Sequence, residues 1–139
     1  MTLSFKYKKV DRPVPLPPAL YPIIPITLRG KEKQLDVMAL LDSGADYTAI
    51  PKGIAEYIGM DLSKKAETIV GVGGKIQAIP SRVMINIQHG HESYSISAEV
   101  RVLDVDDKFP MLIGRKDFFE KFEITFKEKD KRIILKKVS

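Results

Sequence analysis

An aspartate that directly follows an apolar run is the first place in this sequence where chemistry is expected. Residues 37–41 read VMALL, and Asp42, Ser43 and Gly44 come next. By average residue usage, an Asp-Ser/Thr-Gly triplet occurs by chance in on the order of one chain in twenty of this length, and all three residue types also form turns. However, burying a carboxylate costs free energy unless a partner or a reaction uses it. The apolar run before Asp42 and the small Ala45 after Gly44 therefore favour a carboxylate at the floor of a site over a hairpin tip.

A glycine-rich stretch further along the chain is the second candidate. Residues 70–75 read VGVGGK. The phosphate-binding patterns GxxxxGK[ST] and GxGxxG do not fit, because Ile69 stands where the first pattern needs Gly and Ile76 replaces its final Ser or Thr. Glycine accepts positive φ and lets backbone amides approach a ligand closely. The stretch therefore indicates a mobile hairpin tip.

Two further patterns carry less weight on their own. MLIG at residues 111–114 reads as a core strand that ends just before Arg115. His89 and His91 flank Gly90, but a His-Gly-His turn without a third ligand at useful spacing is more often an exposed loop than a metal site. We assign the histidines no role, and we expect no metal and no cofactor.

The composition indicates one globular domain. The chain has 139 residues, 44% hydrophobic and 29% charged, which is enough for one core and too few for two ordinary domains. No apolar run approaches the ~18 residues of a membrane helix, and residues 1–10 lack the apolar segment of a secretory signal. We therefore expect a soluble, cytoplasmic protein with no membrane partner. The absence of Cys rules out disulfides and thiolate chemistry.

The net charge of +5 comes from 23 basic and 18 acidic residues spread along the chain. Basic and aromatic residues are interleaved only in SFKYKK, at residues 4–9, and no stacking signature for nucleic acid stands out. The basic charge therefore indicates a solvated surface, and we expect no nucleic-acid partner.

The pattern of apolar residues predicts a mostly β fold that positions these candidates. We expect strands at residues 3–10, on both sides of a turn at 29–33, at 83–87, at 94–105 and at 109–114, and hairpins that turn at 71–74 and 129–130. Short helices are expected at 52–58, between Pro51 and Gly59, and at 115–122. Six prolines at positions 13–25 make the segment after the first strand extended, and we expect it to wrap a surface as an arm. Many short strands favour a barrel or a sandwich.

Taken together and in this order, ALLDSGAD, IVGVGGK and LIGR resemble the motifs of the retropepsin-like aspartic proteases, the family of retroviral proteases and their cellular relatives. The motifs correspond to the family's active-site loop, its glycine-rich flap and the Gly-Arg segment that opens a short helix. The resemblance covers roughly residues 24–126, and Ser43 stands where retroviral proteases more often have Thr. It implies an all-β fold, a closed barrel of the retropepsin type with one or two short helices. We expect this domain at residues 24–139, preceded by an N-terminal strand and proline-rich arm at 1–23.

The resemblance also implies how Asp42 is used. An aspartic protease needs two carboxylates around one water, and this chain has a single DSG motif, so the second Asp42 must come from a second chain. The active site would then lie on the twofold axis of a homodimer. Two adjacent carboxylates share one proton, which suits an aspartic endopeptidase that acts on a polypeptide substrate. Ser43 would hydrogen-bond across the dyad to the partner chain, and Gly44 would leave room for the substrate backbone.

The substrate-binding residues are implied in the same way. They are Leu40, Ala45, Asp46, Val70, Val72, Gly73, Gly74, Pro110 and Leu112. Residues 45 and 46 would bind the substrate backbone, residues 72 and 73 would form the flap tip, and residues 40, 70, 110 and 112 would line the substrate pockets. Asp46 and Arg115 would also form an internal ion pair behind the active-site loop, because Arg suits bidentate carboxylate geometry.

Two other classes of function remain open at this point. One is a catalytically silent retropepsin-like domain that dimerises and binds extended peptides, and the other is a basic β-barrel that binds nucleic acid. The intact Asp42, Ser43 and Gly44 argue against a silent domain, since a binding module has no need of a buried pair of carboxylates.

The sequence also suggests where a dimer would form. In retroviral relatives the interface is a sheet that interleaves both chain ends. Here the prolines of the arm lack amide donors. We therefore expect the C-terminal hairpin, with partly apolar edges that need a partner, to dominate the interface.

Overall fold

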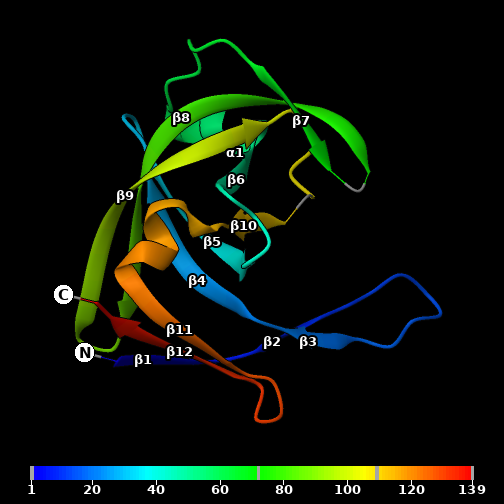
Figure 1. Cartoon of the computed structure of the whole chain (residues 1–139), viewed down its shortest axis with the longest axis vertical. Helices are drawn as coiled ribbons and strands as arrows, with labels where there is room; N and C mark the ends of the chain where they lie inside the picture. Colours follow the sequence, from blue (N-terminus) through cyan, green and yellow to red (C-terminus); the bar gives the residue numbers. More distant parts are fainter. Residues whose placement is uncertain (1, 72, 109, 139) are drawn as a thin grey trace.

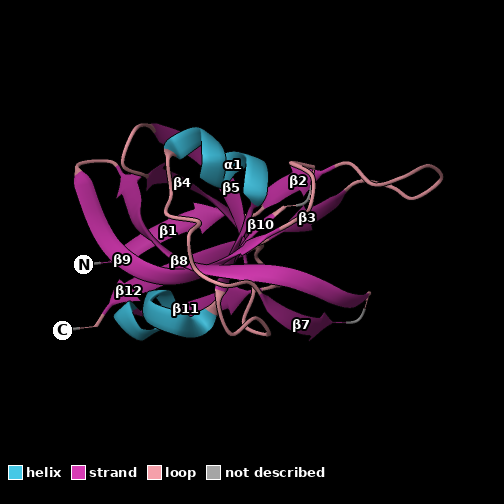
Figure 2. Ribbon diagram, turned by 90° about the horizontal axis from the view of Figure 1, so that it is seen from above, coloured by secondary structure: helices cyan, strands magenta, loops and turns pink. Residues whose placement is uncertain are grey.

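The structure is a computed structural model that describes residues 2–71, 73–108 and 110–138, and these residues form three β-sheets (Figure 1, Figure 2). The strands are β1 (Thr2–Lys6), β2 (Lys8–Val10), β3 (Ala19–Tyr21), β4 (Ile23–Arg29), β5 (Gln34–Leu41), β6 (Thr48–Pro51), β7 (Glu67–Gly71), β8 (Gly74–His89), β9 (Glu92–Leu103), β10 (Met111–Ile113), β11 (Phe122–Lys127) and β12 (Arg132–Lys137). The prediction of an all-β fold is confirmed. Within the described ranges, no helix has the length and hydrophobicity needed to cross a lipid bilayer.

The largest sheet carries the segments that the sequence analysis singled out. Its strand order is β4-β5-β10-β6-β9-β8-β7, so the short β10 lies between β5, to which it is parallel, and β6, to which it is antiparallel. In addition, Thr27–Arg29 of β4 pairs with residues 84–86 of β8, which curls the sheet back on itself. This pairing joins only three residues of each strand, so the closed barrel stays a prediction.

One regular helix, α1 (Lys52–Ile58), covers part of the core, as predicted. It starts after Pro51, whose ring fixes φ near the helical value, and ends at Gly59, which has the left-handed φ of 80° that glycine accepts without strain. Ala55 and Ile58 are fully buried and pack into the main core.

A second short helical segment, η1 (Arg115–Phe119), follows β10, also as predicted, but its first turn is irregular. Asp117 has a positive φ of 66°, and its carboxylate accepts a hydrogen bond from the Glu99 amide at 2.8 Å. Because this bond ties the turn to β9, the side chain compensates for an unfavourable backbone conformation. Phe118 is fully buried and fixes the segment to the core.

The chain ends form a separate three-stranded sheet in the order β1-β12-β11, and Figure 1 shows both termini beside it. We expected the C-terminal hairpin to offer open edges to a partner chain. For β12 this expectation is wrong, because β1 and β11 occupy its two edges. Leu3 and Phe5 of β1 and Ile133 and Leu135 of β12 are buried in the same core as the large sheet.

The proline-rich arm forms a hairpin of its own and does not wrap a surface. Strands β2 and β3 pair from Lys8 with Tyr21 to Val10 with Ala19, and most of the prolines lie in the loop at residues 11–18, where no strand amide is needed. Val14 in this loop is 96% exposed. Figure 1 and Figure 2 both show the hairpin projecting from the body of the molecule, so the wrapping expectation was wrong.

Candidate active site

Asp42 lies immediately after β5, at the point where that strand leaves the core. Its amide donates a hydrogen bond to the Ile113 carbonyl at 3.0 Å, and the amide of Leu41 donates to Pro22 at 3.0 Å. These bonds fix the backbone on both sides of the carboxylate. The Asp42 side chain accepts the Gly44 amide at 2.9 Å, which closes a tight turn and leaves the residue half-buried.

The loop at residues 42–47 is joined to the segment after β10 by backbone hydrogen bonds. Arg115 donates its amide to Ala45 and Lys116 donates to Asp46, each at 2.9 Å. The Gly114 amide donates to the buried hydroxyl of Thr48 at 3.2 Å. Gly114 also packs so closely on the backbone of Tyr47 that no side chain would fit there. The LIGR segment therefore acts as a support for the aspartate loop.

The structure joins Asp46 and Arg115 by an ion pair. Their side chains are 75% and 57% exposed. The pair therefore lies on the surface of the chain, whereas we had expected an internal pair. An exposed pair contributes little to stability. The backbone hydrogen bonds from Arg115 and Lys116 therefore carry more of the connection between the loop and its support.

A cleft of about 760 Å³ opens beside Asp42. The predicted site residues that line it are Asp42, Gly44, Ala45, Asp46, Val70, Gly73, Gly74 and Leu112. The flap hairpin of β7 and β8 forms one wall, and Gly73 and Gly74 have open space around them. Gly74 has a φ of 112°, a conformation that other residues rarely adopt. The structure therefore brings the aspartate loop, the flap and β10 to a single cleft.

Some predicted residues do not line this cleft. Leu40 shares a sheet face with its register partner Leu112 but does not line the cleft. Pro110 is exposed outside the cleft, and Ser43 is exposed beside Asp42 without lining it. Val72 lies outside the described residues.

Sequence reasoning missed several residues of the cleft. These are Tyr47, Ala49, Glu67, Ile69, Lys75, Ile76, Arg101 and Leu103. Ile69, Ile76 and Leu103 lie on the flap strands and β9, and Ala49 lies on β6, so the fold and not a local pattern brings them together. Arg101 had a signal of its own, because it is the one charged residue in the apolar run from Val100 to Leu103.

The buried Arg101 is held by several groups at once. Burial tends to lower its pKa, but the hydrogen bond to Glu99 and the charge of Glu67 outweigh this effect, so the pKa is raised above its ordinary value. Its guanidinium carbon lies 3.8 Å from the centre of the Tyr47 ring, a cation–π contact. The wall of the cleft therefore contains a permanent positive charge with carboxylate partners.

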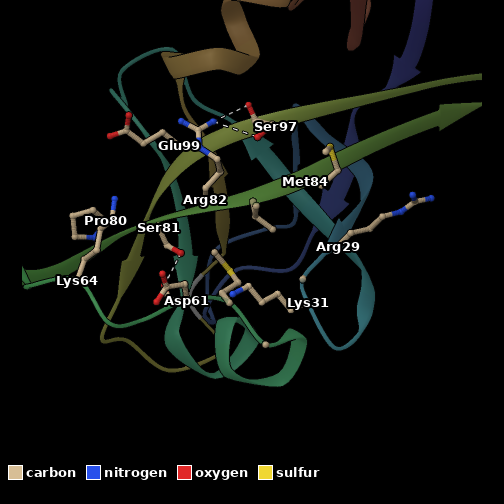
Figure 3. Close-up of a pocket in the computed structure, with 14 residues that line it drawn as sticks. Arg29, Lys31, Asp61, Lys64, Pro80, Ser81, Arg82, Met84, Ser97 and Glu99 are labelled. Carbon is tan, nitrogen blue, oxygen red and sulfur yellow. Dashed lines mark hydrogen bonds between the residues drawn. The ribbon is translucent and has the colours of Figure 1, made fainter.

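A second hollow, of about 640 Å³, lies where β4, β8 and β9 meet the segment after α1 (Figure 3). Its charged side chains include Arg29, Lys64, Arg82 and Asp61. The Asp61 carboxylate accepts bonds from the hydroxyl and the amide of Ser63, at 2.6 and 2.9 Å, and these bonds lower its pKa. That carboxylate closes a local turn, so we place the candidate active site in the cleft beside Asp42.

His89 forms an aromatic contact with the first strand. The ring of His89 stacks on Phe5 with 5.0 Å between ring centres. In the part of the chain that the structure describes, no three His, Asp or Glu side chains gather in a way that could hold a metal ion.

Comparison with known proteins agrees with this geometry. Residues 24–116 match the model of a family described as aspartyl protease. Among solved structures, a retropepsin-like aspartic protease from Rickettsia conorii is similar with a TM-score of 0.58 and 19% identity, over 97% of this chain and 91% of that one. The protease of EIAV, solved with the inhibitor HBY-793, is similar with a TM-score of 0.52 and 20% identity, over 76% of this chain and 88% of that one. No curated protein sequence matches the chain significantly. At these identities the solved structures establish the fold alone, which is that of the retropepsins.

Proposed function

Because the chain belongs to the aspartyl protease family, we propose that it is an aspartic endopeptidase whose active site is completed by a homodimer. Two Asp42 carboxylates, one from each subunit, would activate the water that attacks a peptide bond. The observation that carries this proposal is the position of Asp42, in a cleft under a glycine-rich flap and on a loop fixed by backbone hydrogen bonds to residues 113–116.

The charges of the cleft support a role for Asp42 in particular. Three carboxylates line the cleft, and two of them have a cationic partner: Asp46 pairs with Arg115 and Glu67 pairs with Arg101. Among the described residues, Asp42 forms no ion pair, and its side chain bonds only the amide of Gly44. Because Asp42 has no cationic partner of this kind in the described part of the chain, we infer that it pairs with the Asp42 carboxylate of a second subunit, related to it by a twofold axis.

The proposed mechanism uses the repulsion between two adjacent carboxylates. Both cannot ionise easily at short distance, so the pair holds one proton. The ionised member takes a proton from the water, while the protonated member donates to the oxygen of the scissile carbonyl. The result is a gem-diol intermediate without a covalent bond to the enzyme. Ser43 would bond to the partner chain across the dyad and hold the two loops in register.

The substrate would be an extended polypeptide with apolar side chains near the scissile bond. Ala45 and Asp46 line the cleft. The Ala45 amide and both carbonyls already form hydrogen bonds within the chain, so we expect the Asp46 amide to pair with the substrate backbone. Val70 and Leu112, with Ile69, Ile76 and Leu103, provide apolar surface for its side chains. Peptide binding in this manner uses backbone hydrogen bonds for affinity and pockets for specificity.

The test is Asp42→Asn, measured with an unfolded protein substrate. The amide oxygen of Asn can still accept the Gly44 hydrogen bond, so the loop is expected to keep its structure. However, an amide cannot take a proton from water, so cleavage should fall by at least ~100-fold. Asp36→Asn is the matched control, because Asp36 is an exposed carboxylate on β5, the strand that leads to Asp42, and its substitution is expected to leave cleavage unchanged.

A clean Asp42→Asn preparation that cleaves at the wild-type rate would refute the proposal. If the wild-type protein binds an extended peptide but cleaves none, and Asp42→Asn binds it equally well, the chain is instead the silent peptide-binding domain.

A further inference from the structure

The flap hairpin has a defined base at Glu67 and Ala78. Glu67 is the first residue of β7, and it pairs with Ala78 of β8. On its other side, Ala78 pairs with Leu103, the last residue of β9. Beyond this point, at residues 68–71 and 74–77, β7 and β8 pair only with each other among the described residues. The pairing with β9 therefore stops at the level of Glu67. Beyond it the flap is a two-stranded ribbon, and Figure 1 shows this ribbon extending from the sheet.

A free two-stranded hairpin is marginally stable, and its direction depends on how its base is held. At this base the structure places one side-chain ion pair. Arg101 donates from Nε to the Glu67 carboxylate at 3.2 Å, so β9 holds the first residue of β7. The Arg101 side chain is 11% exposed, and that of Glu67 is 51% exposed. The pair therefore has one end anchored in the protein and one end at the rim of the cleft.

Arg101 is anchored at three further points. Its Nη1 donates to the Glu99 carboxylate at 3.0 Å and to the Val100 carbonyl at 3.2 Å. Its guanidinium also stacks on the ring of Tyr47, which belongs to the loop that carries Asp42. Glu99 is on the same strand, at the rim of the hollow in Figure 3. One side chain thus connects the sheet, the aspartate loop and the first residue of the flap.

We propose that Arg101 is a positioning residue. Its ion pair with Glu67, called the clasp below, holds the base of the flap, and its contact with Tyr47 couples that base to the aspartate loop. The clasp sets how far the flap stands from Asp42, and hence how well the cleft holds an extended peptide. The effect on cleavage rests on the proposed protease function, whereas the effect on the flap itself does not.

The first test is Glu67→Gln, which removes the charge and keeps the size of the side chain. We expect amide hydrogen exchange at residues 68–71 and 74–77 to accelerate by roughly two- to fivefold, the range for a half-exposed ion pair. KM for a peptide substrate should rise by a similar factor, while kcat changes less, because the clasp acts on the closed flap and not on the dyad.

Arg101→Lys is a second variant, because it keeps the positive charge but cannot donate from several nitrogens at once. It is expected to accelerate flap exchange as well. The matched control is Glu128→Gln, which removes a carboxylate from the ion pair with Lys131 in the turn between β11 and β12. This control should leave flap exchange and KM unchanged.

The exchange measurement is repeated in the Asp42→Asn protein, where no cleavage is required. If flap exchange in Glu67→Gln equals that in Glu128→Gln, the clasp does not exist and the proposal is overturned. If exchange accelerates but KM stays at the wild-type value, the claim that the clasp acts on substrate binding is overturned. A wild-type protein without protease activity, but with faster flap exchange in Glu67→Gln, would refute the proposed function and keep the clasp.

Discussion

Replacing Gly114 by Ala tests whether the aspartate loop is positioned by its contact with the segment after β10. Gly114 has φ −95° and ψ −176°, an extended conformation that any residue adopts. The substitution therefore adds no backbone strain, and its effect reports on packing alone. A Cβ at this position would overlap the carbonyl group of Tyr47 and lie 2.9 Å from the carbonyl oxygen of Ala45.

The size of the effect follows from this overlap. Real Cβ atoms essentially never come within 3.0 Å of such neighbours, so the loop at residues 44–47 must retreat by some tenths of an ångström up to about 1 Å. Overpacking of this kind costs about 1–3 kcal/mol, which corresponds to a fall of roughly 1 M in the urea midpoint. A displacement of about 1 Å at catalytic groups can lower the reaction rate ~100-fold, so kcat/KM should fall much more than stability alone would suggest.

The assay combines urea unfolding, followed by far-UV circular dichroism, with kcat/KM on an unfolded protein substrate under native conditions. Gly53→Ala is the control. The three atoms nearest to its Cβ belong to the exposed carboxylate of Asp107, which can move, and Ala in place of Gly within α1 should stabilise the protein by up to ~1 kcal/mol. A Gly114→Ala protein with the wild-type urea midpoint and kcat/KM would show that this contact does not position the loop.

Two more predictions concern the sheet formed by the chain ends. Leu135→Ala should lower the free energy of unfolding by about 2–5 kcal/mol, because Leu135 is fully buried in the core; a urea midpoint no lower than that of the exposed-site variant Leu20→Ala would contradict this. The Glu128 carboxylate accepts bonds from Lys131 and from the Tyr7 hydroxyl, which lower its pKa from the ordinary value of 4.5. Because the pKa is lowered in the folded protein, these bonds contribute fully to the free energy of unfolding above pH 4.5, and the contribution is lost as the pH falls through the lowered pKa. The stability difference between wild type and Tyr7→Phe, measured by urea unfolding across pH, should therefore shrink below pH 4.5, and a difference that stays constant down to pH 2 would count against it.

The parts of the fold that local patterns encode were predicted correctly. Helix α1 has Pro before it and Gly after it, and the glycines between β7 and β8 mark a hairpin tip. Asp42 follows an apolar strand, as its sequence context indicated. In each case the signal lies within a few residues of the feature it predicts, so no knowledge of distant contacts is needed.

The parts that depend on distant contacts were the ones missed. The strand β12 has the alternation of an edge that needs a partner, but the partner is β1, from the other end of the chain. The prolines indicated an extended segment, yet a pairing between β2 and β3 turned it into a projecting hairpin. Arg101 reads as an anomaly in an apolar strand, and only the fold brings it to Glu67 and Tyr47. A local pattern states that a residue needs a partner but does not identify it.

The pairing of β1 with β12 also imposes an order on folding. Thr2 pairs with Lys136, so all the residues between them must be made before this contact can close. At synthesis rates of about 5–20 residues per second, β1 leaves the ribosome on the order of ten seconds before its partner strand. Throughout that interval Leu3 and Phe5 expose apolar surface that the finished protein buries. Contacts between such distant residues slow folding, so the newly made chain depends most on protection from aggregation at its first strand.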